Sequence, residues 1–306
     1  MAPLLSSVSR AFAELPSAAR GIAFMLAGGL LAALMMAMVR HVSEDLHPFV
    51  ITFWRSLFGV VVLVPLYFRH GIGALKTRRH GMHVVRGSLN AVVTLSMFMG
   101  FSMIPLAKAA ALSFSGPLFS TLLAVFLLGE VLRLRRVVAL IFGFTGALVI
   151  LRPGWIEIDT GSLYMLLGAA TWGAATIVVK ILVRTEASTT IVMYMSLYAS
   201  AFALIAAIPV WQMPDANQFV WLAALGACGS LTHICFAQSL RVAEVSLVLP
   251  LDFMRLIWSA IIGYVVFTET PVIWTWLGGF MIFSAATYIA IRESRREKAG
   301  TGRTQS

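Results

Sequence analysis

Charged residues are scarce in this chain. Only 12% of its 306 residues are charged, whereas 59% are hydrophobic, and the mean hydropathy is +0.89. A soluble domain is usually about 25% charged and about 45–50% apolar, so this composition excludes a water-soluble protein and indicates an integral membrane protein. A net charge of +10 would suggest nucleic acid as the partner of a soluble protein. Here the basic residues cluster in short loops, and we expect no nucleic-acid binding.

Cysteine, histidine and acidic residues are also few, which limits the chemistry. Cys228 and Cys235 lie seven residues apart in one apolar stretch, and we interpret them as small buried residues rather than a disulfide or a metal pair. His233 has no second histidine or carboxylate at ligand spacing, so we expect no metal, no cofactor and a helix-bridging role. A membrane-embedded enzyme would need clustered His, Asp or Glu residues at one depth in the membrane. The apolar runs contain no such cluster, so we expect that the protein is not an enzyme. The pattern G-x-x-x-x-G-K-[ST] is absent, so ATP does not drive this protein directly.

Long apolar runs dominate the sequence. We draw ten of them, at 21–40, 48–69, 82–104, 107–128, 137–152, 161–182, 189–211, 218–239, 244–267 and 272–291. Most meet the roughly 20 residues that a spanning helix requires, and the fifth is short enough to need flanking residues. Alternation with a period of two is absent, which excludes a membrane β-barrel. The predicted fold is an all-α bundle of ten transmembrane helices.

Basic residues mark one side of the membrane. The even-numbered loops and the C-terminal tail carry most of them: Arg69, Lys76, Arg78, Arg79, Arg133, Arg135, Arg136, Arg184, Arg241, Arg292, Arg295, Arg296, Lys298 and Arg303. The odd-numbered loops offer only Arg40, Lys108 and Arg152. The positive-inside rule therefore predicts cytoplasmic tails at 1–20 and 293–306 of a multi-pass protein in the bacterial cytoplasmic (inner) membrane. The first tail lacks an apolar core and a cleavage site, which argues against a signal peptide.

Two glutamates suggest an internal repeat. Glu130 closes the run VFLLGE in the first half of the chain, and Glu269 closes the similar run YVVFTE in the second half. We infer two five-helix repeats, at 21–152 and 160–292. An odd number of spans inserts the second repeat from the opposite side, and inverted repeats of transporters hold their site near the midplane. The alternative is that a ten-helix protein yields such similarity by chance.

Several motifs resemble a known family. SFSGPLFSTLLAVFLLGE (113–130) and PLDFMRLIWSAIIGYVVFTETPVIWTWLGG (250–279) are similar to the paired motifs of the drug/metabolite transporter superfamily, EamA type. FWRS (53–56) and VRGSLN (85–90) resemble the branch that contains bacterial riboflavin transporters and rickettsial S-adenosylmethionine transporters. Thr268 departs from the commonest pattern, in which a small residue precedes the glutamate. The resemblance implies secondary transport of a small metabolite.

Charged residues inside the apolar runs are the first candidates for a site. Asp252 and Arg255 lie near the middle of the run 243–269, three residues apart and just after Pro250. Arg55 lies about seven residues inside the second run. A charge at the centre of a membrane helix costs roughly 2.5–3.5 kcal/mol, so we expect all three to face a shared solute pocket. The alternatives are structural ion pairs of Asp252 with Arg255 or with Arg55.

Polar and aromatic residues extend this set. Arg86, Asn90 and Thr94 form a polar stripe along the third run, and Trp172 lies too deep in the sixth for an aromatic belt. We predict that Asn90 and Trp172 line the site, with Trp172 stacking on a planar solute. Helix-to-helix hydrogen bonding and ordinary packing are the alternatives.

Glu130 and Glu269 end their spans, where they are gates or bind loop backbone and neighbouring arginines.

We expect a secondary transporter that works by alternating access on a small-molecule substrate. Riboflavin uptake is the first choice, because a neutral planar solute suits arginine donors and aromatic faces. S-adenosylmethionine uptake or exchange, and export of amino acids or drugs, are the alternatives, as is a channel or a structural multispan subunit. The lipid bilayer is an expected partner, and a homodimer is left open.

Overall fold

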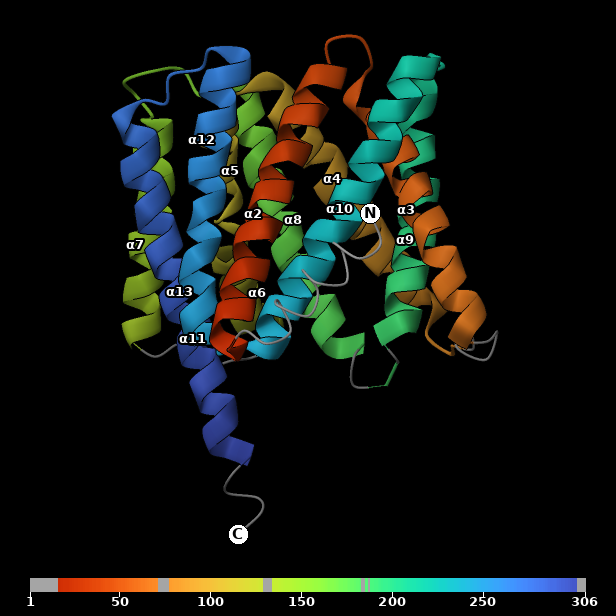
Figure 1. Ribbon diagram of the computed structural model, residues 1–306. Coiled ribbons are helices and arrows are strands. Elements are labelled where there is room, and N and C mark those ends of the chain that lie inside the picture. The colour runs from red at the N-terminus through yellow and green to blue at the C-terminus, as the bar shows by residue number, and fades with distance from the viewer. Residues whose placement is uncertain (1–15, 71–76, 129–133, 183–184, 187, 302–306) are drawn as a thin grey trace.

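The described part of the chain is almost entirely helical. The computed structural model describes residues 16–70, 77–128, 134–182, 185–186 and 188–301 (Figure 1). The first half contains α2 (Ser17–Val42), α3 (Pro48–His70), α4 (His80–Met103), α5 (Leu106–Ser113), α6 (Gly116–Leu128) and α7 (Leu134–Leu151). The second half contains α8 (Thr160–Leu182), α9 (Ser188–Ala207), η2 (Ile208–Val210), α10 (Ala216–Val242), α11 (Val245–Val248), η3 (Leu249–Phe253), α12 (Met254–Phe267) and α13 (Ile273–Thr301). These ranges contain no strand.

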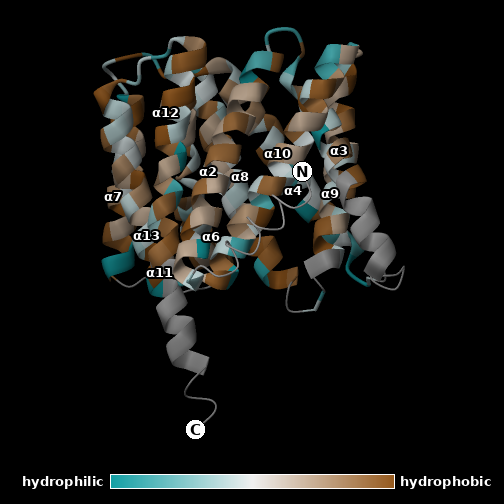
Figure 2. Cartoon of the chain, in the orientation of Figure 1, coloured by the Kyte–Doolittle hydropathy of each residue, from teal (hydrophilic) through white to brown (hydrophobic). Residues whose placement is uncertain are grey.

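Most of these helices fit a bilayer. Nine helical segments in the described ranges are long and apolar enough to cross a membrane, and a shorter apolar stretch, Pro48–Val61, lies in α3. Hydrophobic residues occur along most of the helices (Figure 2), and many large ones are exposed; Phe126 is 75% exposed and Val265 is 71% exposed. Lipid is the environment in which such exposure is favourable. The predicted all-helical membrane fold is confirmed, and the fifth span uses flanking residues as expected.

The two ends of the bundle can be told apart in Figure 1. At the lower end α2 begins and α13 ends, whereas the α2–α3 and α12–α13 links lie at the upper end. Helix extends into both predicted tails, because α2 already begins at Ser17 and α13 continues to Thr301. Residues 292–300 are mostly Arg, Glu, Lys and Ala, which are good helix formers, so the last helix continues beyond its apolar stretch.

Two spans that the sequence predicts as continuous helices are interrupted. In the segment 107–128, α5 and α6 are separated at Phe114 and Ser115; in the segment 244–267, α11 passes into the 3-10 turn η3 before α12 begins. Proline explains both interruptions: Pro117 and Pro250 lack the N–H group that a regular helix needs. The Ser115 hydroxyl donates to the Leu112 carbonyl over 2.7 Å, which satisfies backbone that the first break leaves irregular.

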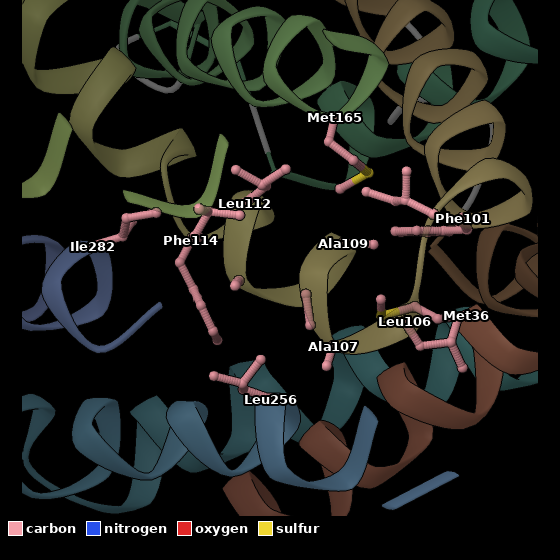
Figure 3. Packing of buried hydrophobic residues seen from close by; sticks show 14 of the residues in the cluster. Met36, Phe101, Leu106, Ala107, Ala109, Leu112, Phe114, Met165, Leu256 and Ile282 are labelled. Atoms are coloured by element: carbon pink, nitrogen blue, oxygen red, sulfur yellow. The ribbon is translucent and has the colours of Figure 1, made fainter. Parts of the chain in front are cut away.

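The first half of the broken span, α5, lies at the centre of the bundle. Its residues Ala109, Ala110 and Ala111 are fully buried. Around it pack side chains from α2, α8, α12 and α13 (Figure 3), namely Met36, Met165, Leu256 and Ile282. Alanine side chains let helices approach closely, and van der Waals packing of this kind drives helix association in membranes. The core therefore holds the first helix break in a fixed position.

The helix pairings repeat when the two halves are exchanged. The first span, α2, packs along α10, the third span of the second half; correspondingly, α8 packs along α4. The second spans pair with each other as α3 and α9, and the fifth spans as α7 and α13. The broken fourth spans meet as α5 and α12. Each half thus contributes the same surfaces to the interface.

Candidate functional site

The two helix breaks meet at one point in the bundle. The Phe114 ring, in the first break, stacks on the Phe253 ring in the second, with centroids 6.3 Å apart and planes 26° apart. These phenylalanines have the same separation along the chain as Glu130 and Glu269. Phe283 of α13 closes the cluster, at 4.9 Å from Phe253 and 5.5 Å from Phe114. The breaks therefore face each other through equivalent side chains.

Asp252 and Arg255 lie at the second break. Arg255 Nη2 is 3.6 Å from Asp252 Oδ2, and both side chains are 24% exposed. The Arg255 guanidinium also lies 4.5 Å from the centroid of the Phe114 ring, so it reaches across to the first break. Its Nε is buried without a hydrogen-bond partner. The ion pair that the sequence analysis gave as the alternative to a shared pocket is present, and both of its side chains are partly exposed.

Trp172 lies against the first break from α8. A Cβ at Gly116 would be 2.8 Å from Trp172 Cε3, so the indole can lie here only because that position is glycine. Trp172 is nevertheless 41% exposed. Phe114 is two residues from Gly116, so one break contacts both Arg255 and Trp172. An exposed indole is suited to stack on a flat solute.

Arg55 belongs to a second group, at the junction of α3, α4 and α10. Its guanidinium lies 5.6 Å from the centroid of the Phe98 ring and against the backbone of Gly229, where an added Cβ would be 2.7 Å from Arg55 Nη2. In the described residues no ion pair joins Arg55 to Asp252. A cation–π contact contributes about 0.5–2 kcal/mol, which is less than the roughly 2.5–3.5 kcal/mol cost of a charge at mid-membrane. Arg55 is therefore under-compensated.

The polar stripe on α4 faces the same junction. Arg86 Nη1 donates to Asn90 Oδ1 at 3.5 Å, the long limit of a hydrogen bond. The Thr94 hydroxyl donates back to the Asn90 carbonyl over 3.0 Å, so Thr94 satisfies its own helix. The positive charges of Arg55 and Arg86 both act on His233 of α10. Asn90 is thus placed beside Arg86, while no described contact joins this group to Asp252, Arg255 or Trp172.

Glu269 ties several elements together at the upper end. Its Oε1 is 2.6 Å from Arg40 Nη1, at the end of α2, and its Oε2 accepts a hydrogen bond from the Leu106 backbone N–H over 2.8 Å. Arg40 also donates to the Ile104 carbonyl over 2.7 Å. Glu269 therefore contacts an arginine and the backbone N–H at the start of α5, and its role as a gate stays a prediction. The partner is Arg40. The other predicted gate, Glu130, lies outside the described residues.

A second tie at the upper end involves Asp159, which precedes α8. Its carboxylate pairs with Lys108 of α5 and accepts the Ser162 N–H over 2.7 Å. Burial opposes ionisation of this carboxyl, but the hydrogen bonds from Lys108 and Ser162 outweigh it, so the pKa of Asp159 is lowered from its ordinary 3.8. Both ties join the central helix α5 to the second half of the chain.

The lower end has different features. A cavity of about 690 Å³ opens there between the start of α2 and the α10–α11 link; it is lined by Ser17, Ala18, Arg241, Val242, Ala243, Glu244 and Leu247. It contains none of the predicted site residues, so we do not assign the solute to it.

The described residues contain no cluster of His, Cys, Asp or Glu that is able to hold a metal ion. Cys228 and Cys235 are free thiols.

Some residues of the site were not singled out from the sequence. Phe114 and Phe253 form the contact between the breaks, and Gly116 and Gly229 make room for Trp172 and Arg55. For the two phenylalanines, the separation that they share with the two glutamates was available as a signal. No pattern in the sequence distinguished these two glycines, since their role depends on which helix lies opposite.

Comparison with known proteins agrees with this architecture. The model of the EamA-like transporter family matches the chain twice, at residues 19–152 and 159–291. An S-adenosylmethionine uptake transporter of Rickettsia felis is 31% identical over 84% of this chain and 88% of its own length. A riboflavin transporter of Vibrio cholerae is 30% identical over 91% and 96%, respectively. A crystal structure with 18% identity has a TM-score of 0.58, covering 88% of this chain and 95% of that one, which shows a shared fold. The chain therefore belongs to the EamA-like transporter family.

Proposed function

We propose that this protein is a secondary transporter that moves a small metabolite by alternating access. In this proposal ten spans form two inverted five-helix halves, with both termini and the lower end of Figure 1 in the cytoplasm. The twofold match of the family model and the exchangeable helix pairings support the repeat. The start of α2 and the end of α13 at one end support termini on one side. The excess of Lys and Arg assigns that side to the cytoplasm.

One observation carries the proposal: two broken helices meet with a charged pair between them. Broken helices with polar groups at the break are how transporters expose a binding site at the midplane. Here the Phe114–Phe253 contact joins the breaks, and the Asp252–Arg255 pair lies beside it, partly accessible. We assign substrate binding to Asp252, Arg255, Trp172, Arg55 and Asn90.

Riboflavin uptake is the first candidate activity. The isoalloxazine ring is flat and carries carbonyl groups, and the site offers an exposed indole at Trp172 and arginine donors at Arg55 and Arg255. The similarity to the Vibrio cholerae riboflavin transporter, over nearly all of both chains, supports this choice.

S-adenosylmethionine uptake is the second candidate. The similarity to the Rickettsia felis transporter favours it. So does the under-compensated positive charge of Arg55, because this solute carries a carboxylate as well as a planar base. Its sulfonium and ammonium groups would need Asp252 to leave Arg255, since like charges repel strongly at low dielectric.

Glu269 is the gate in this scheme. From the α12–α13 link it contacts α2 and the start of α5 at the upper end, which is the outer end in the proposed orientation. Opening the outer side then requires that the Arg40–Glu269 pair separate.

Growth rescue tests the activity. The gene is expressed in a riboflavin auxotroph and, separately, in a strain that depends on external S-adenosylmethionine. We expect growth of the first strain at riboflavin concentrations that do not support the empty vector. An Arg55→Ala variant at equal membrane abundance should lose the rescue.

Rescue of only the second strain would replace riboflavin by S-adenosylmethionine. If neither strain grows although the protein is in the membrane, and proteoliposomes accumulate neither labelled solute, the proposed substrates are wrong. Normal transport by Arg55→Ala would remove that arginine from the site.

A further inference from the structure

Two internal arginines lack a counter-charge. Within the described ranges no carboxylate lies within 4.0 Å of Arg55 or Arg86, whereas Arg40 pairs with Glu269 and Arg255 with Asp252. The Nε atoms of Arg55 and Arg86 are buried, and no group in the described part of the chain forms a hydrogen bond with them. Uncompensated guanidinium groups in membrane helices are costly and normally mark a function.

These two arginines come from different helices but act on one histidine. Arg55 belongs to α3 and Arg86 to α4, and the charges of both reach His233 on α10. Gly226 and Gly229 pack against α3, and His233 follows Gly229 by four residues on the same helix face. That face packs closely at the two glycines, yet His233 itself is exposed.

The chemistry of the group is that of an anion receptor. Arg55 makes a cation–π contact with Phe98, and Arg86 has only a long hydrogen bond to the neutral Asn90, so neither contact removes the positive charge. A guanidinium presents a planar set of donors that matches the oxygens of a carboxylate or a phosphate. An imidazole adds one further donor. An anionic group at this junction would supply the counter-charge that the two arginines lack.

We propose that Arg55, Arg86 and His233 form an anion subsite that binds the carboxylate or phosphate of the transported solute. This inference rests on the proposed transport function and, of its two candidate solutes, favours S-adenosylmethionine, because riboflavin carries neither a carboxylate nor a phosphate. The solute then has two parts: a flat part at the helix breaks, beside Trp172 and Arg255, and an anionic group at the α3–α4–α10 junction. A solute that has lost its anionic group binds more weakly.

Two matched pairs of compounds test the subsite on the purified full-length chain. S-adenosylmethionine is compared with its decarboxylated form, and riboflavin 5′-phosphate with riboflavin. Binding is measured by thermal unfolding in detergent, which does not require transport. Within the pair that binds, we expect the anionic member to bind at least tenfold more tightly, since hydrogen bonds between charged groups are the strong ones.

Substitutions assign the preference to residues. Arg55→Gln and Arg86→Gln should each reduce the ratio of affinities within the pair to about threefold or less, and Arg86→Lys should retain part of it. Arg135→Gln, at an exposed position of α7, is the matched control and should leave the ratio unchanged. The comparison of compounds on the unaltered chain decides the question even if a variant does not fold.

Three results would overturn the subsite. Equal affinities within both pairs would do so, as would ratios that survive both glutamine substitutions. The third is that chloride alone stabilises the protein, that this effect requires both arginines, and that the affinity ratio within each pair of compounds stays at one. Arg55, Arg86 and His233 would then bind a structural counter-ion and not the solute. Failure of the transport function gives a different result, in which the affinity ratio is preserved but proteoliposomes accumulate neither labelled solute.

Discussion

The two helix breaks differ in chemistry although they occupy equivalent positions. Phe114 and Phe253 correspond under the offset that relates Glu130 to Glu269, and they touch. Under the same offset Asp252 corresponds to Ser113 and Arg255 to Gly116. One break therefore carries an ion pair, while the other is uncharged and uses its glycine to admit Trp172. The two repeats have the same arrangement of helices, and the residues of the candidate site differ between them.

The strongest test removes the charge from one break only. Asp252→Asn leaves Arg255 without its carboxylate, and we expect the transport rate to fall about tenfold or more, equivalent to about 1.4 kcal/mol. Removing one partner of a buried pair costs about 3–5 kcal/mol, and partial exposure lowers that figure here. Initial uptake rates in proteoliposomes measure the effect.

The equivalent position in the other half is the matched control. The Ser113 hydroxyl bonds only to the Ala110 carbonyl in its own helix, so Ser113→Ala should change the uptake rate less than twofold. Equal losses in Asp252→Asn and Ser113→Ala would show that the two breaks do not differ in function.

Filling the space at the first break should mainly affect stability. A Cβ at Gly116 meets the Trp172 ring at 2.8 Å, so Gly116→Val should lower the free energy of unfolding by about 1–3 kcal/mol. Combining it with Trp172→Ala should recover part of the loss. Gly59→Ala is the control, since nothing lies within 4 Å of its added Cβ. Thermal unfolding in detergent is measured for the unaltered chain, Gly116→Val, Gly116→Val with Trp172→Ala, and Gly59→Ala. If Gly116→Val is as stable as the unaltered chain, Trp172 does not pack against Gly116.

The contact between the Phe114 and Phe253 rings, which joins the two breaks, should contribute a smaller free energy. A double-mutant cycle of Phe114→Leu and Phe253→Leu should give a coupling of about 0.5–1.5 kcal/mol, the value typical of aromatic pairs. Phe119 and Phe144 meet edge to face away from the second break and provide a reference pair. Additive effects of the two leucine substitutions would mean that the breaks are not coupled through these rings.

The smallest effect should lie away from both breaks. Because the pKa of Asp159 is lower in the folded chain than its ordinary 3.8, its ionised form stabilises the fold above that value. This contribution should be lost as the pH falls through the lower, folded pKa. Asp159→Asn should therefore unfold with a weaker dependence on pH between about 5 and 3 than the unaltered chain. Identical pH profiles would remove the Lys108–Asp159 tie as a source of stability.

Prediction from the sequence succeeded where apolar length and charge decide the outcome. The spans follow from runs of apolar residues, and the Asp252–Arg255 pair is the alternative that their spacing along one span allowed. The breaks were missed, because a proline inside a membrane helix often only bends it when neighbouring groups satisfy the backbone. The partner of Glu269 was also missed, since Arg40 is remote in sequence and reaches it only through packing.

By itself, the sequence determined that this is a helical membrane protein with charges inside its spans. A helix that crosses the lipid needs a continuous run of apolar residues, and such a run, like a charge within it, can be read directly from the sequence. Only the tertiary structure decided which of those charges meet. It paired Arg40 with Glu269 and placed Arg55 and Arg86 near His233, since such contacts join helices that are distant along the chain. Close approach at Gly229 brings α10 against Arg55 of α3, and glycine shows its role only when the opposite surface is known.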